Sequence, residues 1–205
     1  MGIYSRYVFP RLMDFAMSSG QMSKVRAVVL SGVSGDVFEI GFGTGLNLPH
    51  YPDHVKRLAT ADPNAGMCGL ARRRIDEAGI EVTHHTVGGE SLPLDDASFD
   101  CVVCTWTLCS IPNVERALLE LHRILRPNGK LHFVEHGIAE DEKVRRWQHR
   151  LTPIQRIVGD GCRFDLDMRA LIQSQNFRFE KIENYYLPKS PKFAGYLYQG
   201  IAAKA

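Results

Sequence analysis

Short apolar runs alternate with amphipathic stretches along most of this chain. The runs that predict strands lie at 37–40, 58–61, 82–87, 99–106, 131–135, 177–186 and 196–202. Helical spacing fills 64–78 and 114–125 between the earlier runs, and this alternation is typical of a parallel sheet with helices on both faces. No full helix separates the last two runs, which predicts an antiparallel edge. We therefore expect an α/β fold with a seven-stranded, mostly parallel sheet.

The 205 residues carry no internal repeat and no break in composition, so one domain over 1–205 is expected. A helical segment at 1–35 precedes the first strand and is predicted to cover the strand ends as a lid. The aromatic residues expected to close this lid are Tyr4, Tyr7, Tyr185 and Tyr186. An insertion at 139–170, rich in charge and interrupted by proline and glycine, is predicted to be the least regular part and to shape a substrate pocket.

The charge balance excludes a polyanion as the main partner. Lysine and arginine number 25 against 23 acidic residues, so no strong field gathers nucleic acid. Five cysteines, an odd number, are typical of reduced, packed thiols rather than of a disulfide framework. The sequence shows no secretory signal and no run of about 20 apolar residues. These features predict a cytoplasmic protein without stable membrane insertion.

A glycine-rich turn, Gly41-Phe42-Gly43-Thr44-Gly45, follows the first predicted strand and is expected to lead into a helix that ends near Pro49. Leu46 stands where a dinucleotide fingerprint has its third glycine, which argues against NAD. Glu39 precedes the turn, and Asp62 ends the next strand, about 20 residues on, where a carboxylate can accept hydrogen bonds from a ribose. The pattern therefore predicts a nucleoside ligand without a pyrophosphate.

At these residues the chain resembles the class I S-adenosylmethionine-dependent methyltransferases, whose fold is Rossmann-like. The turn Leu125-Arg126-Pro127-Asn128-Gly129 before the fifth strand matches the same family. The resemblance implies S-adenosylmethionine as the cofactor, with its methionine part at the glycine loop, its ribose at Asp62 and its adenine at the loop after the third strand. The residues expected to bind it are Glu39, Gly41, Gly43, Gly45, Asp62, Pro63, Gly89, Glu90 and Thr105.

Three further strings are similar to one branch of this family, the methyltransferase-like thiol S-methyltransferases and their bacterial relatives. They are Cys104-Thr105-Trp106-Thr107-Leu108-Cys109-Ser110, Phe133-Val134-Glu135-His136-Gly137 and Asp160-Gly161-Cys162. This similarity implies a small thiol acceptor such as sulfide or methanethiol. Two alternatives stay open, namely a phospholipid or quinone-type methyltransferase at a membrane surface and a binding module that senses S-adenosylmethionine without catalysis.

His136 and Thr105, at the ends of their strands, are the candidate catalytic residues, with His136 taking the proton of a thiol acceptor. The residues expected to contact the acceptor are Tyr7, Trp106, Cys109 and His136. Each has a structural alternative, because a histidine after a strand, a packed tryptophan and a small buried thiol are ordinary core features. No metal site is predicted, since Cys101 and Cys104 point to opposite faces of a strand.

Overall fold

The sheet of this protein has seven strands in the order β3-β2-β1-β4-β5-β7-β6. A computed structural model describes residues 2–205, with the backbone alone at Cys68. The strands are β1 (Val37–Ile40), β2 (Arg57–Ala61), β3 (Glu81–His85), β4 (Phe99–Thr105), β5 (Leu125–His136), β6 (Phe177–Tyr186) and β7 (Tyr196–Lys204). The first five run parallel, and β7 pairs antiparallel with β5 and with β6. The predicted α/β sheet with an antiparallel edge is confirmed.

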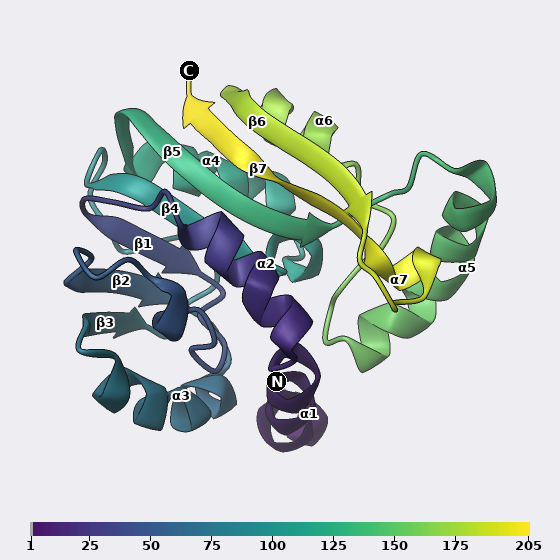
Figure 1. The fold of residues 1–205 in the computed structure, drawn as a ribbon, viewed down its shortest axis with the longest axis horizontal. Helices are drawn as coiled ribbons and strands as arrows, with labels where there is room; N and C mark the ends of the chain where they lie inside the picture. The colour runs from purple at the N-terminus through teal and green to yellow at the C-terminus, as the bar shows by residue number, and fades with distance from the viewer. Residues whose placement is uncertain (1) are drawn as a thin grey trace.

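Helices cover both faces of the sheet (Figure 1). The α-helices are α1 (Phe9–Met17), α2 (Gly20–Leu30), α3 (Ala65–Ala78), α4 (Val114–Ile124), α5 (Glu142–Val158), α6 (Met168–Ser174) and α7 (Lys192–Gly195). A π-helical turn η1 (Tyr4–Val8) precedes α1, and short 3₁₀ turns form η2 (Leu48–His50) and η3 (Leu108–Ser110). Figure 1 shows α2 across one face, α4 and α6 behind the other, and α5 beyond the ends of β5 and β6, beside α7.

Two apolar layers hold these helices on the sheet, because successive side chains of a strand point to opposite faces. On β1, Phe38 and Ile40 belong to the layer that contains Leu118 of α4, and Val37 belongs to the layer that contains Leu30 of α2. Cys101 and Cys104 likewise fall into different layers, as the strand geometry predicts. The central strand β1 is therefore packed on both faces, which fixes its register in the sheet.

The strand order reverses direction between β1 and β4. After β1 the chain builds outward through β2 and β3, and it then returns to pair β4 with the other side of β1. The connections leave the carboxyl ends of β1 and β4 in opposite directions. This opens a crevice along the carboxyl ends of the parallel strands. The predicted binding residues at the ends of β1, β2, β4 and β5 thus converge on one edge.

The N-terminal segment covers this crevice. Asp14 of α1 accepts a hydrogen bond from Thr44 of the glycine turn at 2.6 Å and forms an ion pair with Arg74 of α3 at 2.7 Å. At the other side, Ser5 donates to the carboxylate of Asp160 at 2.7 Å. The segment therefore contacts both the glycine turn and the insertion.

Two sequence-based expectations about local structure are wrong. Residues 41–47 form turns that lead into η2, in place of the helix expected after the glycine turn, because three glycines there adopt positive φ angles. The insertion, expected to be irregular, contains the 17-residue helix α5, which begins at the N-cap Asp141 and includes Pro153. Gln148 fixes this helix by accepting from the Ala139 amide at 2.8 Å and donating to the Gly137 carbonyl at 3.0 Å.

We expect Leu121→Ala to lower the free energy of unfolding by about 2–5 kcal/mol, because Leu121 is fully buried between α4 and the sheet and its truncation leaves a cavity. Leu119→Ala on the same helix is the matched control, since Leu119 is 52% exposed and the helix propensity changes identically. Urea unfolding of both variants measures the difference. Equal losses would contradict the packing of α4 described above.

Candidate functional site

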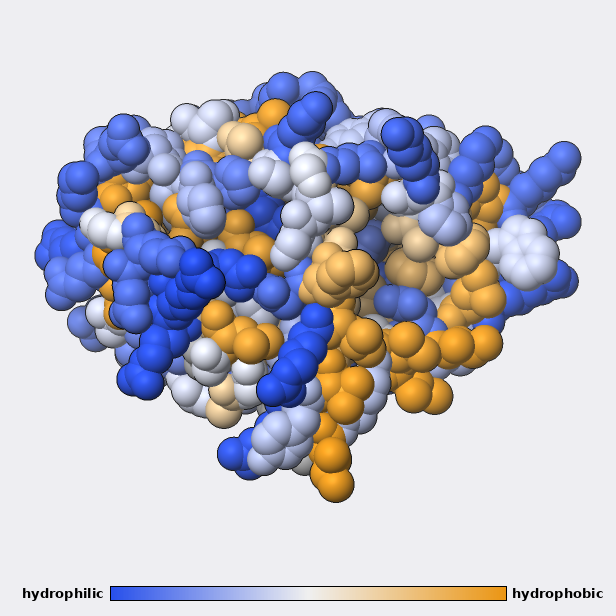
Figure 2. Space-filling model, turned by 60° about the horizontal axis from the view of Figure 1, so that its bottom comes forward, coloured by the Kyte–Doolittle hydropathy of each residue, from blue (hydrophilic) through white to orange (hydrophobic). Residues whose placement is uncertain are grey.

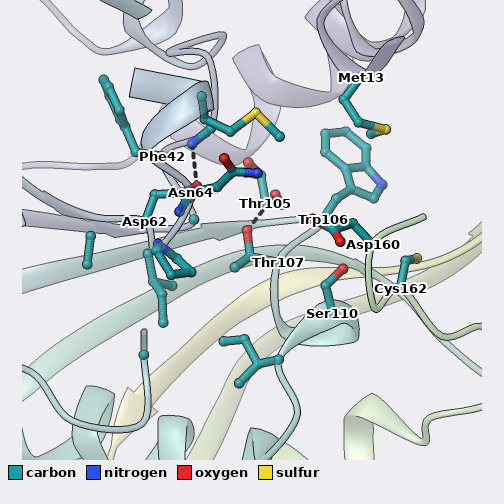
Figure 3. Close-up of a pocket in the computed structure, with 18 of the residues that line it drawn as sticks. Met13, Phe42, Asp62, Asn64, Thr105, Trp106, Thr107, Ser110, Asp160 and Cys162 are labelled. Atoms are coloured by element: carbon teal, nitrogen blue, oxygen red, sulfur yellow. Dashed lines mark hydrogen bonds between the residues drawn. The ribbon is translucent and has the colours of Figure 1, made fainter. Parts of the chain in front are cut away.

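A cavity of about 290 Å³ lies at the carboxyl ends of the parallel strands. Its lining comes from α1, the glycine turn, the ends of β2, β4 and β5, and the loop after α5. Figure 3 shows Asp62 and Asn64 at one side of the cavity and Ser110, Asp160 and Cys162 at the other, with Met13 of α1 facing Trp106. One continuous space therefore connects the expected cofactor residues with the expected acceptor residues.

The glycine turn forms the wall of the cavity next to β1. Gly41, Gly43 and Gly45 have φ angles of 72°, 56° and 77°, which side chains rarely adopt. A Cβ at Gly41 would lie 2.0 Å from Oγ1 of Thr107, so only glycine lets the loop after β4 pack here. At Gly43 the nearest other atom to a Cβ would be 3.8 Å away. The space beside the Cα of Gly43 is thus open to a ligand.

Asp62, at the end of β2, lies in this cavity and is almost fully buried. Its two carboxylate oxygens accept hydrogen bonds from the backbone amides of Gly43 at 2.9 Å and Asn64 at 2.8 Å. Burial raises the pKa of Asp62, and these two hydrogen bonds offset part of that shift. Each carboxylate oxygen can accept a second hydrogen bond, which is what two ribose hydroxyls require.

Glu39 lies beneath the glycine turn, with both carboxylate oxygens already engaged. Asn47 donates to Glu39 at 2.9 Å and to Oγ1 of Thr105 at 3.0 Å, and the Tyr51 hydroxyl donates to Glu39 at 2.6 Å. Burial raises the pKa of Glu39 to about 7 despite these hydrogen bonds. These contacts favour a positioning role for Glu39 and Thr105, which tie β1 to β4 below the cavity.

The loop after β3 forms the end of the cavity expected for adenine. A Cβ at Gly89 would lie 2.3 Å from the Cδ1 of Ile40, so the backbone packs directly on β1. Glu90 lines the cavity, and its carboxylate accepts from the Asn113 amide at 3.4 Å. Ile111, which the sequence did not single out, adds an apolar side chain to this lining. Pro63 lines the cavity beside Asp62.

Arg26 of α2 is a site residue that the sequence analysis missed. The guanidinium is buried, lies 4.9 Å from the Trp106 ring and donates to the Met17 carbonyl at 3.0 Å. Within residues 2–205, its Nε has no hydrogen-bond partner. Burial lowers the pKa of Arg26 to about 10, so it stays cationic at neutral pH. A buried cation lining the cavity beside the glycine turn suits the carboxylate of a methionine moiety.

Glu135 near the end of β5 holds the loop after β4. Its carboxylate accepts from the backbone amides of Thr107 at 2.8 Å, Leu108 at 3.0 Å and Cys109 at 3.2 Å. Burial raises the pKa of Glu135, and these hydrogen bonds oppose the shift. The sequence contained one signal for this role, an acidic residue directly after the apolar pair Phe133-Val134.

The three strings similar to thiol methyltransferases meet at the far side of the cavity. The sulfurs of Cys109 and Cys162 lie 3.6 Å apart, and Nδ1 of His136 lies 3.7 Å from the first and 3.6 Å from the second. Hydrogen bonds from Cys109 and His136 hold the pKa of Cys162 well below its usual value. Burial alone would lower the pKa of His136, but contact with Cys162 raises it overall.

Not every predicted contact residue faces this cavity. His136, Trp106 and Thr105 line it, but the lining found among residues 2–205 includes neither Cys109 nor Tyr7. Cys109 is buried behind His136, and Tyr7 is 52% exposed on the outer side of η1, against the guanidinium of Arg6. The inward-facing residues of the N-terminal segment are instead Phe9, Met13 and Met17, spaced four apart on one face of α1.

Tyr185 and Tyr186, also expected in the lid, lie on β6 at the antiparallel edge. Tyr185 donates to Gln199 at 2.6 Å, and the Tyr186 ring packs on Tyr196. Tyr4 is part of the covering segment, and its hydroxyl donates to the Val158 carbonyl at 2.6 Å. The covering of the cavity thus comes from the N-terminal helices and the insertion.

Comparison with known proteins agrees with this geometry. The family model described as a methyltransferase domain matches residues 38–133. Human thiol S-methyltransferase TMT1A is 32% identical over 194 residues, spanning 93% of this chain and 74% of that protein. Phosphatidylethanolamine N-methyltransferase of Cereibacter sphaeroides is 30% identical over 164 residues, spanning 72% of this chain and 80% of that protein.

Solved structures share the fold. The crystal structure of an S-adenosylmethionine-dependent methyltransferase from Thermotoga maritima, described as a possible histamine N-methyltransferase, has a TM-score of 0.69 at 24% identity and covers 99% of each chain. This chain belongs to the class I S-adenosylmethionine-dependent methyltransferases. Its cofactor is S-adenosylmethionine, which fits the open space beside the Cα of Gly43 and the unpartnered Nε of Arg26 within residues 2–205. None of the helices in those residues has the length and apolar content that a bilayer crossing requires.

We expect Arg26→Met to weaken binding of S-adenosylhomocysteine by about tenfold or more, because a charge-assisted hydrogen bond to the carboxylate contributes about 1.5–3 kcal/mol. Binding of 5′-methylthioadenosine, which lacks the amino acid carboxylate, should change little. Isothermal titration calorimetry with both ligands measures the difference. Lys24→Met, an exposed substitution on the same helix, is the control. Equal weakening of both ligands would show that Arg26 does not contact the carboxylate.

We expect Glu39→Gln to become more stable relative to the unchanged protein as pH rises. A carboxyl pKa of about 7 in the folded state, against 4.5 for a solvent-exposed glutamate, means that the folded state holds a proton that the unfolded state loses first. The unchanged protein therefore loses free energy of unfolding between pH 4.5 and 7, because Glu39 is costly to ionise in the folded state. The loss levels off above pH 7, at about 3 kcal/mol. Urea unfolding of both proteins from pH 5 to 8 measures it. A constant difference would contradict the raised pKa.

Proposed function

We propose that this enzyme methylates the sulfur of a small thiol. The observation that carries the proposal is the cluster of Cys109, His136 and Cys162 at the end of the cavity opposite Asp62. His136 can take up the proton of a thiol, and the neighbouring thiols offer only weak hydrogen bonds, which suits a thiol better than a phosphate or a sugar. The 32% identity to human TMT1A supports the same acceptor class.

The size of the cavity supports a small acceptor. Its volume of about 290 Å³ lies just below the range of about 300–1,000 Å³ for pockets that hold one drug-sized ligand, so a bound cofactor leaves little room. Phe9 and Met13 of α1 line the cavity from the covering segment. Apolar side chains in this position exclude water from the acceptor end.

S-adenosylmethionine, when bound, supplies an electrophilic methyl group on a sulfonium that leaves readily. The acceptor sulfur forms a bond to the methyl carbon while the carbon–sulfonium bond breaks, its electron pair staying with S-adenosylhomocysteine and the thiol proton passing to solvent. The residues that line the cavity hold the acceptor sulfur and the methyl group in line. This alignment is the main source of rate acceleration for such a displacement. We propose that His136 and Cys162 prepare the acceptor as a thiolate, the reactive form of a thiol.

A second candidate function, methylation of a phospholipid or quinone at a membrane surface, is favoured by an exposed apolar surface beside the cavity. Figure 2 shows apolar side chains gathered over the N-terminal helices and α5. The exposed large apolar residues of residues 3–17 and α5 are Ile3, Tyr4, Tyr7, Val8, Leu12, Phe15, Trp147, Ile154, Ile157 and Val158. An area of this kind marks an interaction surface.

A panel assay separates the candidates. We expect S-adenosylhomocysteine to form when the protein is incubated with S-adenosylmethionine and sulfide, methanethiol or another small thiol, and little to form with phosphatidylethanolamine vesicles. Turnover on vesicles together with silence on every thiol would favour the second function. Silence on both, with tight cofactor binding, would favour a binding module.

We expect His136→Ala to lower kcat for the thiol by about 100-fold, the lower end of the range for losing a group that manages the acceptor's proton. The Kd for S-adenosylhomocysteine should stay within about twofold, because His136 lies at the acceptor end. His149→Ala, an exposed substitution on α5, is the control. Equal loss of turnover and of cofactor affinity would show that His136 acts on the cofactor instead.

A further inference from the structure

The cluster of Cys109, His136 and Cys162 brings three metal-ligating atoms together from segments far apart in sequence. The two sulfurs and Nδ1 all lie within 4.8 Å of one another, with separations of 3.6, 3.6 and 3.7 Å. Around a tetrahedral zinc ion, with Zn–S of about 2.3 Å and Zn–N of about 2.0–2.1 Å, ligand atoms lie about 3.5–3.8 Å apart. The three atoms therefore already occupy three corners of a zinc-sized tetrahedron.

Each of the three ligands is held in place by contacts outside the cluster. Glu135 accepts from the Cys109 amide at 3.2 Å, which fixes η3. The Arg163 amide donates to the Cys109 carbonyl at 2.9 Å, so the residue after Cys162 is tied to the same turn. The His136 ring packs edge-on against Phe164 with centroids 5.5 Å apart. Such preorganisation is what a metal site requires of its ligands.

The turn before Cys162 adopts a shape that permits this approach. Gly161 has a φ of 103°, and a Cβ there would lie 2.7 Å from the Ser110 carbonyl oxygen. Only glycine lets the loop after α5 pack this closely on η3. The Cys162 amide donates to the Gly159 carbonyl at 3.1 Å, which completes the turn.

Two of the three ligands line the cavity. His136 and Cys162 line the cavity together with Ser110, and Cys109 is buried behind them. Zinc sites with three protein ligands and one open position are catalytic, whereas structural sites close all four positions. We propose that Cys109, His136 and Cys162 bind one Zn²⁺ ion and that the acceptor thiol coordinates it as the fourth ligand. The acceptor half of this inference rests on the proposed function.

The chemistry of the fourth position favours a thiol over an amine. A thiol that coordinates Zn²⁺ releases its proton to solvent and binds as the thiolate, which keeps further lone pairs for the methyl group. An amine would donate to the metal the one electron pair that it needs for methyl transfer. In this arrangement Nδ1 of His136 is a ligand, so His136 acts through the metal and not as the free proton acceptor expected from the sequence.

Metal binding by the full-length protein tests the first half of the proposal. The protein is purified with a phosphine reductant, since thiol reductants would compete, and is loaded with Zn²⁺ or Co²⁺. We expect one metal per chain and a Co²⁺ spectrum with thiolate charge-transfer bands and the visible bands of a tetrahedral ion. Cys109→Ser and Cys162→Ser should each weaken Co²⁺ binding by at least about 100-fold, because one of three ligands is lost.

Cys101→Ala is the matched control, because Cys101 is a buried thiol in the other apolar layer of the sheet. It should bind Co²⁺ like the unchanged protein. Circular dichroism shows whether the serine variants fold. If they do not fold, the charge-transfer intensity of the unchanged protein still reports the number of thiolate ligands. Absence of Co²⁺ binding in the reduced unchanged protein, or retention in both folded serine variants, would overturn the metal site. The metal site would also be overturned if mass spectrometry found a Cys109–Cys162 disulfide and the protein still bound no metal after that disulfide was reduced.

Addition of the acceptor thiol to the Co²⁺ form, with S-adenosylhomocysteine present, tests the second half. A shift of the visible bands supports coordination at the fourth position, and an unchanged spectrum overturns it. If chelated, metal-free protein methylates thiols at the full rate, the inference that the metal coordinates the acceptor fails and the proposed function stands. If the metal binds but no thiol shifts the spectrum or is methylated, the proposed function fails along with the acceptor half.

Discussion

The loop after β4 packs directly against the glycine turn after β1, and the whole site depends on this contact. Thr107 occupies the space that a side chain at Gly41 would need, so the two loops approach at backbone distance. Two buried carboxylates on the flanking strands hold the arrangement. Glu39 on β1 reaches Thr105 through Asn47, and Glu135 on β5 accepts three backbone amides of the turn after β4.

Both carboxylates are placed where burial disfavours their charge, which is why their pKa values are raised. Hydrogen bonds from the loops offset that cost in the folded state only. The buried carboxylates thus lower the stability of the fold but position the loops that line the cavity. These loops are the glycine turn on one side and the start of η3 on the other. A methyl transfer that depends on alignment needs this kind of rigid support.

The N-terminal segment joins the two ends of the cavity. Asp14 connects α1 to Thr44 and Arg74 near the cofactor end, and Ser5 reaches Asp160 near the acceptor end. Close packing accompanies these polar contacts, since a Cβ at Gly66 would lie 2.1 Å from the Arg6 carbonyl oxygen. The outer side of the same segment carries the exposed apolar residues seen in Figure 2. One element therefore covers the reactants and presents an apolar surface to the exterior.

The sequence by itself determined the order of the strands, the helices α3 and α4 between them, the antiparallel edge and the position of Asp62, because each depends on residues close together in the chain. It misassigned α5, whose inward face carries Val144, Gln148 and Thr152 and so lacks a purely apolar stripe. It also missed Arg26 as a cavity residue and placed Tyr7 inside. Only the tertiary structure decided that Cys109 and Cys162, 53 residues apart, meet His136. Such contacts arise from how β5, η3 and the loop after α5 pack in space, which no local pattern of residues encodes.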